Sequence, residues 1–162
     1  EICSDEWNVK QDAGRTTAEA ESDLIPKFPH YKKEIQMYYK NHRKMIRGTY
    51  DLSIKVLENL KKLNYECYVL SNWSAETFEG MIDDYPFLKL FEGLLISGEE
   101  KLMKPDAAIY ELAIKRFNLI PKETVFIDDK IENINAARVL DLNIIHLVNP
   151  TNIESEINKF LI

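Results

Sequence analysis

The pattern that most constrains this chain is an alternation of short apolar segments with helical segments, which begins at Tyr50. The apolar segments have strand length, and we expect strands at 67–70, 94–96, 125–127 and 144–148. Helices are expected between and around them, at 52–63, 75–83, 105–118, 134–140 and 153–160. Strands that alternate with helices predict a parallel sheet with helices on its faces. Residues 49–162 are therefore expected to form an α/β core.

The first part of the chain, residues 1–48, has a different character. It is polar and helix-prone, and it contains no convincing strand. Thr16 and Glu19 have the spacing of a capping box that opens a helix. A second helix is expected from Tyr31 to Arg47, and Gly48 is expected to end it. The sequence predicts a small helical module before the α/β core.

The strand expected at 125–127 ends in two adjacent carboxylates, Asp128 and Asp129. Adjacent like charges repel, and the pKa of one rises unless a cation or a hydrogen-bond donor compensates. At the carboxyl end of a strand in an α/β sheet, the expected compensator is a hard cation such as Mg²⁺. Asn133 is placed to hold the loop together or to reach the site. The alternative is an acidic turn that caps the next helix.

Two other segments place polar groups at comparable positions. Ser71 and Asn72 follow the strand at 67–70, where the hydroxyl, the amide and the backbone N–H groups of the turn can hold phosphate oxygens. Lys104 precedes Pro105 and a helix, and its ammonium can reach across the strand ends. Taken alone, a helix cap and a solvated surface lysine explain these residues better. Trp73 can line the mouth of a pocket or simply pack.

Taken together, these segments resemble the haloacid dehalogenase-like (HAD) hydrolase superfamily. Leu70-Ser71-Asn72 matches its second motif, Lys104-Pro105-Asp106 its third, and Phe126-Ile127-Asp128-Asp129 with Asn133 its fourth. The resemblance covers residues 50–149 closely. The helical start resembles the cap of the subfamily that includes the amino-terminal phosphatases of epoxide hydrolases. The implied fold is a Rossmann-like parallel sheet with a small α-helical cap.

The resemblance implies a Mg²⁺-dependent phosphatase of small phosphorylated metabolites that works through an aspartyl-phosphate. In that mechanism Ser71, Asn72 and Trp73 lie against the phosphorylated substrate, and Lys104 neutralises charge on the nucleophile and the phosphoryl group. Asp129 and Asp128 would bind Mg²⁺. A metal-free haloacid dehalogenase is the alternative enzyme, but family dehalogenases generally carry Ser-Asn where this chain carries the acidic pair. The sequence does not name the substrate.

The family's first motif, an apolar strand that ends in the nucleophilic Asp, has no counterpart in this chain. Ile2-Cys3-Ser4-Asp5 is the nearest candidate, and it is too polar for a buried strand. We therefore expect a truncated or inactive form, and the start at Glu1 suggests a processed, trimmed or partial product. A non-catalytic pseudoenzyme or interaction protein is the alternative from a different class.

The resemblance places the missing strand at the centre of the sheet, between 67–70 and 125–127. Its loss would leave two unpaired strand edges, which invite other chains. The two strands are expected to close directly on each other, to be bridged by a partner chain, or to remain open. In the last case, which we favour, the chain is expected to be marginally stable or to self-associate.

The composition of the chain limits the kinds of partner that we expect it to bind. The formal net charge is −6 and the basic residues are dispersed, which argues against a nucleic-acid partner. No apolar run approaches the roughly 20 residues that span a bilayer, so no membrane segment is expected. Cys3 and Cys67 are far apart and have no nearby Cys/His cluster, so we expect reduced thiols and a cytoplasmic location. A small phosphorylated metabolite is the expected ligand.

Overall fold

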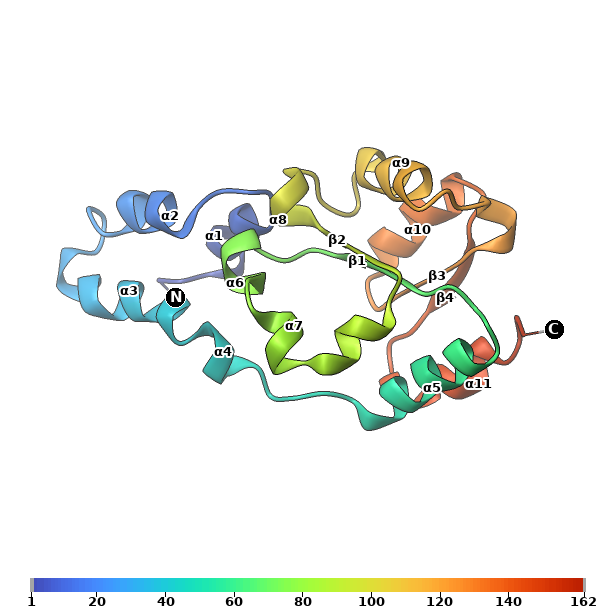
Figure 1. Ribbon diagram of the computed structural model, residues 1–162. Helices are drawn as coiled ribbons and strands as arrows, with labels where there is room; N and C mark the ends of the chain where they lie inside the picture. Colours follow the sequence, from blue (N-terminus) through green and yellow to red (C-terminus); the bar gives the residue numbers. More distant parts are fainter. Residues whose placement is uncertain (1, 162) are drawn as a thin grey trace.

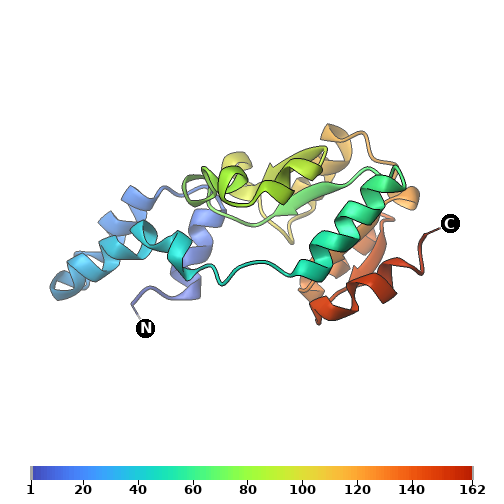
Figure 2. The same ribbon diagram turned by 60° about the horizontal axis from the view of Figure 1, so that its bottom comes forward.

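The computed structural model describes residues 2–161. The first part is helical and lies at one end of the molecule in both views (Figures 1 and 2). Its buried cluster is formed by Trp7, Ala20, Leu24 and Ile35. The helices of this part are α1 (Asp5–Asp12), α2 (Thr17–Leu24), η1 (Pro29–Tyr31), α3 (Lys32–Lys40) and α4 (His42–Met45). As expected, no described residue before Tyr68 belongs to a strand.

The capping box predicted from the sequence is present at the start of α2. The Thr16 hydroxyl accepts from the Glu19 N–H, and the Glu19 carboxylate accepts from the Thr16 N–H at 2.9 Å. This motif is local, since its two residues lie three positions apart. It therefore satisfies the first N–H groups of the helix without help from the rest of the fold.

Two predicted helices are each broken in two, so both predictions were wrong in their extent. The helix expected from Tyr31 to Arg47 is interrupted at Asn41, whose side-chain amide donates to the Met37 carbonyl at 3.0 Å. The Met37 carbonyl also accepts from the Asn41 backbone N–H at 3.0 Å, so it takes two hydrogen bonds from the residue at which α3 ends. The helix expected at 75–83 becomes α6 (Ala75–Phe78) and α7 (Met81–Asp84), because Gly80 adopts a left-handed conformation with φ 76°.

The strands form two separate parallel pairs. β1 (Tyr68–Ser71) pairs with β2 (Gly93–Ile96), and β3 (Val125–Asp128) pairs with β4 (Asn143–His146). The two pairs share no ladder among the residues that the structure describes. The strands are thus parallel, as the sequence predicted, but β1 and β3 have not closed directly on each other.

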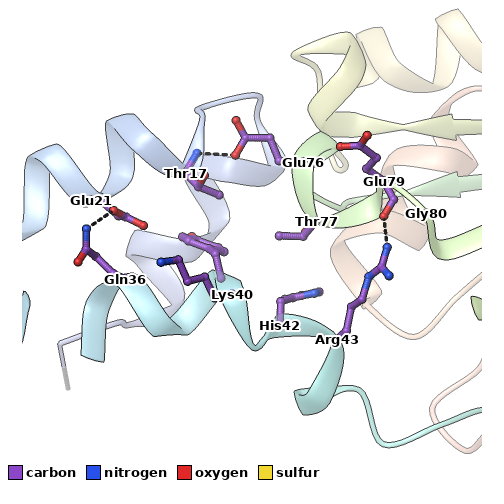
Figure 3. Close-up of a pocket in the computed structure, with 11 residues that line it drawn as sticks. Thr17, Glu21, Gln36, Lys40, His42, Arg43, Glu76, Thr77, Glu79 and Gly80 are labelled. Carbon is purple, nitrogen blue, oxygen red and sulfur yellow. Dashed lines mark hydrogen bonds between the residues drawn. The ribbon is translucent and has the colours of Figure 1, made fainter. Parts of the chain in front are cut away.

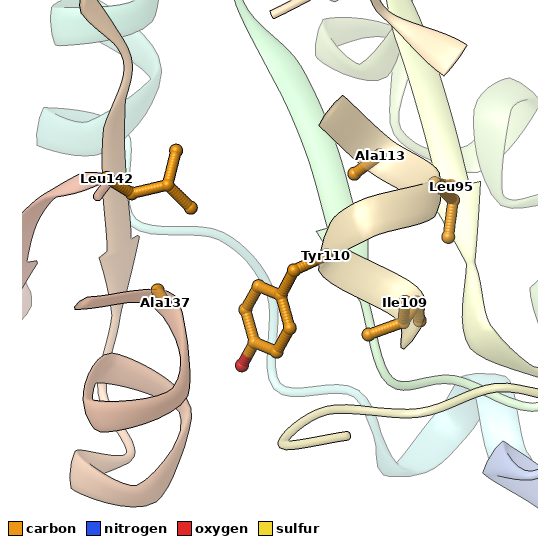
Figure 4. Close-up of a cluster of buried hydrophobic side chains, with 6 residues drawn as sticks. All are labelled: Leu95, Ile109, Tyr110, Ala113, Ala137 and Leu142. Atoms are coloured by element: carbon orange, nitrogen blue, oxygen red, sulfur yellow. The ribbon is translucent and has the colours of Figure 1, made fainter. Parts of the chain in front are cut away.

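Helices pack on opposite sides of the strands (Figure 1). On one side α9 (Ala107–Arg116) and α10 (Ile131–Val139) contribute to a cluster of Leu95, Ile109, Tyr110, Ala113, Ala137 and Leu142 (Figure 4). On the other side α5 (Asp51–Lys62) and α11 (Ile153–Ile157) pack on Val125, Ile127 and Ile145 through Val56, Ile153 and Ile157. Alternate residues of β3 and β4 therefore face opposite helical layers.

Short helical turns complete the core. They are η2 (Pro86–Leu90), α8 (Ser97–Glu100), η3 (Pro121–Glu123) and η4 (Pro150–Asn152). Asp141, after α10, has the left-handed conformation with φ 60°, which Asp tolerates better than most residues. Cys67, expected inside a strand, instead lies one residue before β1 and is half-buried.

Within residues 2–161, no helix combines the length and the apolar character needed to cross a membrane.

Candidate active site

Lys104 lies across the carboxyl ends of β1 and β3. Its ammonium donates to the Leu70 carbonyl at 2.8 Å and to Asp128 Oδ2 at 2.6 Å. The side chains of Lys104 and Asp128 are only 10% and 5% exposed. The lysine is therefore a buried ion-pair partner, and its alternative interpretation as a solvated surface residue does not hold. It joins the third and fourth sequence segments into one site.

The Asn72 side chain holds the backbone of Lys104. Asn72 Nδ2 donates to the Lys104 carbonyl at 2.8 Å, and Asn72 Oδ1 accepts from the Lys104 N–H at 2.8 Å. Both polar atoms of this amide are thus engaged with one residue 32 positions away. Asn72, which the sequence assigned to the substrate, fixes the position of Lys104 in this structure.

Asp128 is buried and fully hydrogen bonded. Its Oδ1 accepts from the Lys130 N–H at 2.8 Å and from Asn133 Nδ2 at 3.0 Å, while Oδ2 accepts from Lys104. Burial acts to raise the pKa of Asp128, but these donors outweigh burial and hold the pKa below its ordinary value. Asn133 therefore supports the acidic loop, which is one of the two roles that the sequence left open.

Tyr110 of α9 supports Asn133, which in turn donates to Asp128. The Tyr110 hydroxyl donates to the Asn133 carbonyl at 3.0 Å inside the cluster of Figure 4. Burial raises the pKa of Tyr110, so its hydroxyl stays protonated and acts as a donor. Asn133 Oδ1 is buried and has no hydrogen-bond partner among the described residues. Through Tyr110, the buried apolar cluster therefore contacts the loop that carries Asp128 and Asn133.

Asp129 differs from its neighbour because its side chain is exposed. Its carbonyl lies 3.0 Å from His146 Nε2, and its carboxylate makes no hydrogen bond or ion pair with the described residues. A hard cation uses one or two carboxylates, with water and phosphate oxygens as its other ligands. The exposed carboxylate of Asp129 fits that donor set. Both oxygens of Asp128 are engaged with Lys104, Lys130 and Asn133, so Asp128 would have to exchange one of these donors to join it. No group of three or more His, Cys, Asp or Glu side chains within residues 2–161 offers a richer metal site.

Ser71 and Trp73 lie on either side of Asn72. Ser71 ends β1 and is half-buried, and its hydroxyl makes no hydrogen bond to another described residue. The Trp73 ring points toward α6, where Nε1 donates to Thr77 Oγ1 at 3.0 Å and the ring lies edge-on to Phe78. Ser71 therefore offers a free hydroxyl to a ligand, whereas Trp73 is a packing residue in this conformation.

The turn after β1 depends on residues that sequence reasoning missed. Ser97 Oγ accepts from the Trp73 N–H at 2.9 Å, and the Gly98 N–H donates to the Trp73 carbonyl at 3.0 Å. A Cβ on Gly98 would overlap the backbone nitrogen of Ala75, so only glycine fits there. A Ser-Gly pair directly after an apolar strand was the available signal.

Asp12 of α1 also reaches this turn. Its carboxylate accepts from the Ser74 backbone N–H and lies near Lys130. Burial raises the pKa of Asp12, and the two neighbours only partly offset this. Gly14, two residues later, approaches Gly98 and Lys101 of the core. The loop between α1 and α2 therefore lies against the core beside the site.

An open cavity of about 580 Å³ lies between the helical part and α6 and α7 (Figure 3). Polar and charged residues line it, among them Lys40, Arg43, Glu76 and Glu79. None of the predicted site residues lines it. The predicted site residues lie instead near the ends of β1 and β3, where the Lys104 ammonium contacts the Leu70 carbonyl and Asp128.

Comparisons with known proteins find similar sequences and similar folds. The chain is 32% identical over 94 residues to a sesquiterpene phosphatase of Aspergillus oryzae, a match that covers 58% of this chain and 48% of that protein. It is 24% identical over 100 residues to an (S)-2-haloacid dehalogenase of Burkholderia cepacia, covering 62% of this chain and 43% of that protein. The chain thus spans about half the length of these curated relatives.

The fold is similar to that of a HAD family enzyme of Bacteroides thetaiotaomicron, solved as a magnesium complex. The TM-score is 0.73 at 23% identity, and the match covers 87% of this chain and 74% of that one. The family model described as haloacid dehalogenase-like hydrolase matches residues 7–147. This chain belongs to the haloacid dehalogenase-like hydrolase family.

Proposed function

We propose that this chain is the phosphate-binding core of a Mg²⁺-dependent phosphatase that acts on small phosphorylated metabolites. The observation that carries the proposal is the position of Lys104, whose ammonium lies between the carboxyl ends of β1 and β3. A free hydroxyl on Ser71 and an exposed carboxylate on Asp129 lie at the ends of the same two strands. A phosphoryl group needs such donors together with a neutralising cation.

Each residue has a proposed role. Ser71 donates its hydroxyl to a phosphoryl oxygen, and Lys104 places a fixed positive charge beside the same group. Asn72 positions Lys104 through the two hydrogen bonds to its backbone. Asp129 would hold Mg²⁺, and Asp128 would join it by giving up one of its present hydrogen bonds. The ion would supply a positive charge that neutralises the negative charge developing on the phosphoryl group.

Covalent catalysis of this kind also needs a carboxylate nucleophile that faces Ser71 and Lys104. Within the described residues, the carboxylate that contacts the Lys104 ammonium belongs to Asp128, and both of its oxygens already accept hydrogen bonds. We infer that the chain as given binds phosphate but does not turn it over. A non-catalytic role remains the alternative from a different class.

A metal-free dehalogenase is the second enzyme candidate, and the match to the haloacid dehalogenase of Burkholderia cepacia supports it. The acidic pair favours the phosphatase, because a metal-free reaction has no use for an exposed carboxylate beside the buried one. Halide release from a 2-haloacid in the absence of metal would favour the dehalogenase instead.

Calorimetric titration with inorganic phosphate tests the proposal. In the presence of Mg²⁺ the chain is expected to bind phosphate, and Ser71→Ala and Lys104→Met are each expected to weaken binding by about tenfold or more, the loss of one charge-assisted hydrogen bond. Lys101→Met is the matched control, since Lys101 is an exposed lysine three residues upstream. Equal losses in Lys101→Met and Lys104→Met, or no binding at all, would contradict a phosphate site at the strand ends.

A further inference from the structure

Although basic residues occur throughout the chain, they concentrate in residues 27–47 of the helical part. This segment carries seven of the 21 Lys and Arg residues of the chain, but only one of its 27 Asp and Glu residues, Glu34. The whole chain has a formal net charge of −6, so the rest of it is strongly acidic. The charge of the molecule is therefore divided between one basic segment and an acidic remainder.

Most cations of this basic segment have no counter-charge. Arg43 is engaged with the core, through the Asp84 carboxylate and the Glu79 carbonyl. The other six are exposed and make no ion pair with the described residues; they are Lys27, Lys32, Lys33, Lys40, Lys44 and Arg47. Like charges in one segment repel each other, and an anionic partner would relieve that repulsion.

The outward face of α3 combines these cations with an apolar side chain. Ile35 is buried in the apolar cluster of the helical part, which fixes the inward face of the helix. Lys33, Met37 and Lys40 follow one another at spacings of four and three residues, so they form one stripe along the helix. Met37 is 55% exposed, although methionine is usually a core residue. The stripe is therefore apolar at its centre and basic at both ends.

Large apolar side chains are also exposed before and after α3. Phe28 and Tyr31 precede the helix and are 38% and 52% exposed, and Met45 of α4 follows it and is 47% exposed. Each is next to a basic residue in the sequence. Apolar side chains interleaved with lysines are typical of surfaces that lie at a membrane interface, where the apolar groups enter the boundary between headgroups and acyl chains.

The position of the basic segment lets it approach a flat surface. The helical part forms one end of the molecule in both views, and α3 lies at its outer edge (Figures 1 and 2). Acidic side chains of α2, which packs on α3, are each engaged by a neighbour within the helical part. Screening acts over about 10 Å at physiological salt, so acidic residues at the opposite end weigh little here.

We propose that the basic segment, with its exposed Phe28, Tyr31, Met37 and Met45, is a contact surface for an anionic lipid membrane. The lysines and Arg47 lie against the lipid headgroups, where each cation adds to the attraction. The four apolar side chains enter the boundary between headgroups and acyl chains. The contact is peripheral, and the α/β core remains in water.

Single-stranded nucleic acid is the other polyanion that a basic surface can bind, and this segment fits it less well. Such sites stack bases on aromatic rings. Two of the four exposed apolar side chains are methionines, which have no ring, and Met37 is at the centre of the stripe on α3. Five of the six unpaired cations are lysines, whereas arginine is the residue favoured for nucleic-acid recognition.

Vesicle flotation tests the proposal, and it requires neither turnover nor phosphate binding at the strand ends. Its outcome is therefore independent of the proposed phosphatase function. The chain is expected to float with vesicles of equal parts phosphatidylserine and phosphatidylcholine at low salt, and to remain behind when the vesicles contain phosphatidylcholine alone. Raising the salt concentration is expected to release it.

Two triple variants with the same change of charge locate the contact. Each cation near an anionic surface contributes about fivefold, so loss of three is expected to weaken vesicle binding about a hundredfold. The test variant carries Lys33→Gln, Lys40→Gln and Lys44→Gln. The control carries Lys55→Gln, Lys115→Gln and Lys122→Gln, which neutralise exposed lysines of the core, and it is expected to bind like the unchanged chain.

The apolar contribution is tested separately. Met37→Ser is expected to weaken vesicle binding by about fivefold, because a side chain that enters the membrane boundary is lost. Val139→Ser, at a position 83% exposed on α10, is the control and is expected to have no effect. Anisotropy of a labelled single-stranded oligonucleotide measures the competing interaction. Three results would overturn the proposal: no preference for anionic vesicles, equal losses in the two triple variants, or tighter binding of the oligonucleotide that Met37→Ser leaves unchanged.

Discussion

The ammonium of Lys104 lies 2.6 Å from Asp128 Oδ2, although the two residues are 24 positions apart in the chain. Both side chains are nearly buried, and each has further hydrogen bonds, to Leu70 for the lysine and to Lys130 and Asn133 for the aspartate. This pair ties the turn before α9 to the end of β3. It holds a positive charge at the position where we propose that phosphate binds.

Neutralising one member of the pair should destabilise the fold. Asp128→Asn leaves the Lys104 ammonium buried without its counter-charge, and loss of one partner of a buried pair costs about 3–5 kcal/mol. Urea unfolding measures the change. Lys159→Met in the exposed pair with Glu156 is the control, expected to cost less than about 1 kcal/mol. Similar costs for the two variants would show that the buried pair is not specially stabilising.

Asn72→Ala should weaken phosphate binding through Lys104 and not directly. The substitution removes both hydrogen bonds that fix the Lys104 backbone. In a double-mutant cycle, its effect on phosphate affinity should largely vanish in the Lys104→Met background. Asn149→Ala, which removes a capping amide at η4, should leave phosphate affinity unchanged. Additive effects of Asn72→Ala and Lys104→Met would instead indicate that Asn72 contacts phosphate itself.

Mg²⁺ should raise the thermal midpoint of the chain. At ten times its dissociation constant, a cation that binds only the folded state adds about 1.4 kcal/mol, or about 3–5 °C for a chain of this size. Asp129→Ala should remove the shift, while Asp83→Ala in the exposed acidic pair with Asp84 should keep it. A melting curve that does not change in millimolar Mg²⁺ would count against a formed cation site.

The chain should be inactive, or nearly so, toward generic aryl phosphates. A covalent mechanism that lacks its nucleophile can lose as much as about 10⁶ in rate. The assay is phosphate release in Mg²⁺, with Ser71→Ala and Lys104→Ala as reference variants. Robust turnover that both variants abolish would show that another carboxylate acts as the nucleophile. In a protein that carries the missing motif, both substitutions should depress activity strongly.

The amino-terminal cap of α2 should weaken in acid. Hydrogen bonds from the Thr16 N–H and hydroxyl lower the pKa of Glu19. Because the folded pKa lies below the unfolded value of about 4.3, the stabilisation is present above that pH and is lost as pH falls through the folded pKa. Chemical shifts of the first turn of α2 should report this change. Glu19→Gln still caps but does not titrate, so its profile should stay flat.

Local features of the fold could be predicted from the sequence because their partners lie close together along the chain. The Thr16–Glu19 capping box and the apolar runs of the four strands each depend on a few neighbouring residues. The polar groups at strand ends could be predicted for the same reason, since parallel strands present their carboxyl ends at one edge. Ser71 and Asp128 were found in this way, whereas Lys104, which precedes a helix, was joined to them through the family resemblance.

Only the tertiary structure decided what each polar group does. Asn72 turns to Lys104 and not to open solvent because a residue 32 positions away supplies both hydrogen bonds. Asp128 is buried and Asp129 exposed, although the two are adjacent and chemically identical, because adjacent residues at a strand end face different surroundings. The breaks at Asn41 and Gly80 are local departures of the backbone from helical geometry, which periodicity does not encode. The sequence determined which groups gather at the strand ends, and long-range packing determined which of them are buried, which are paired and which remain free to bind.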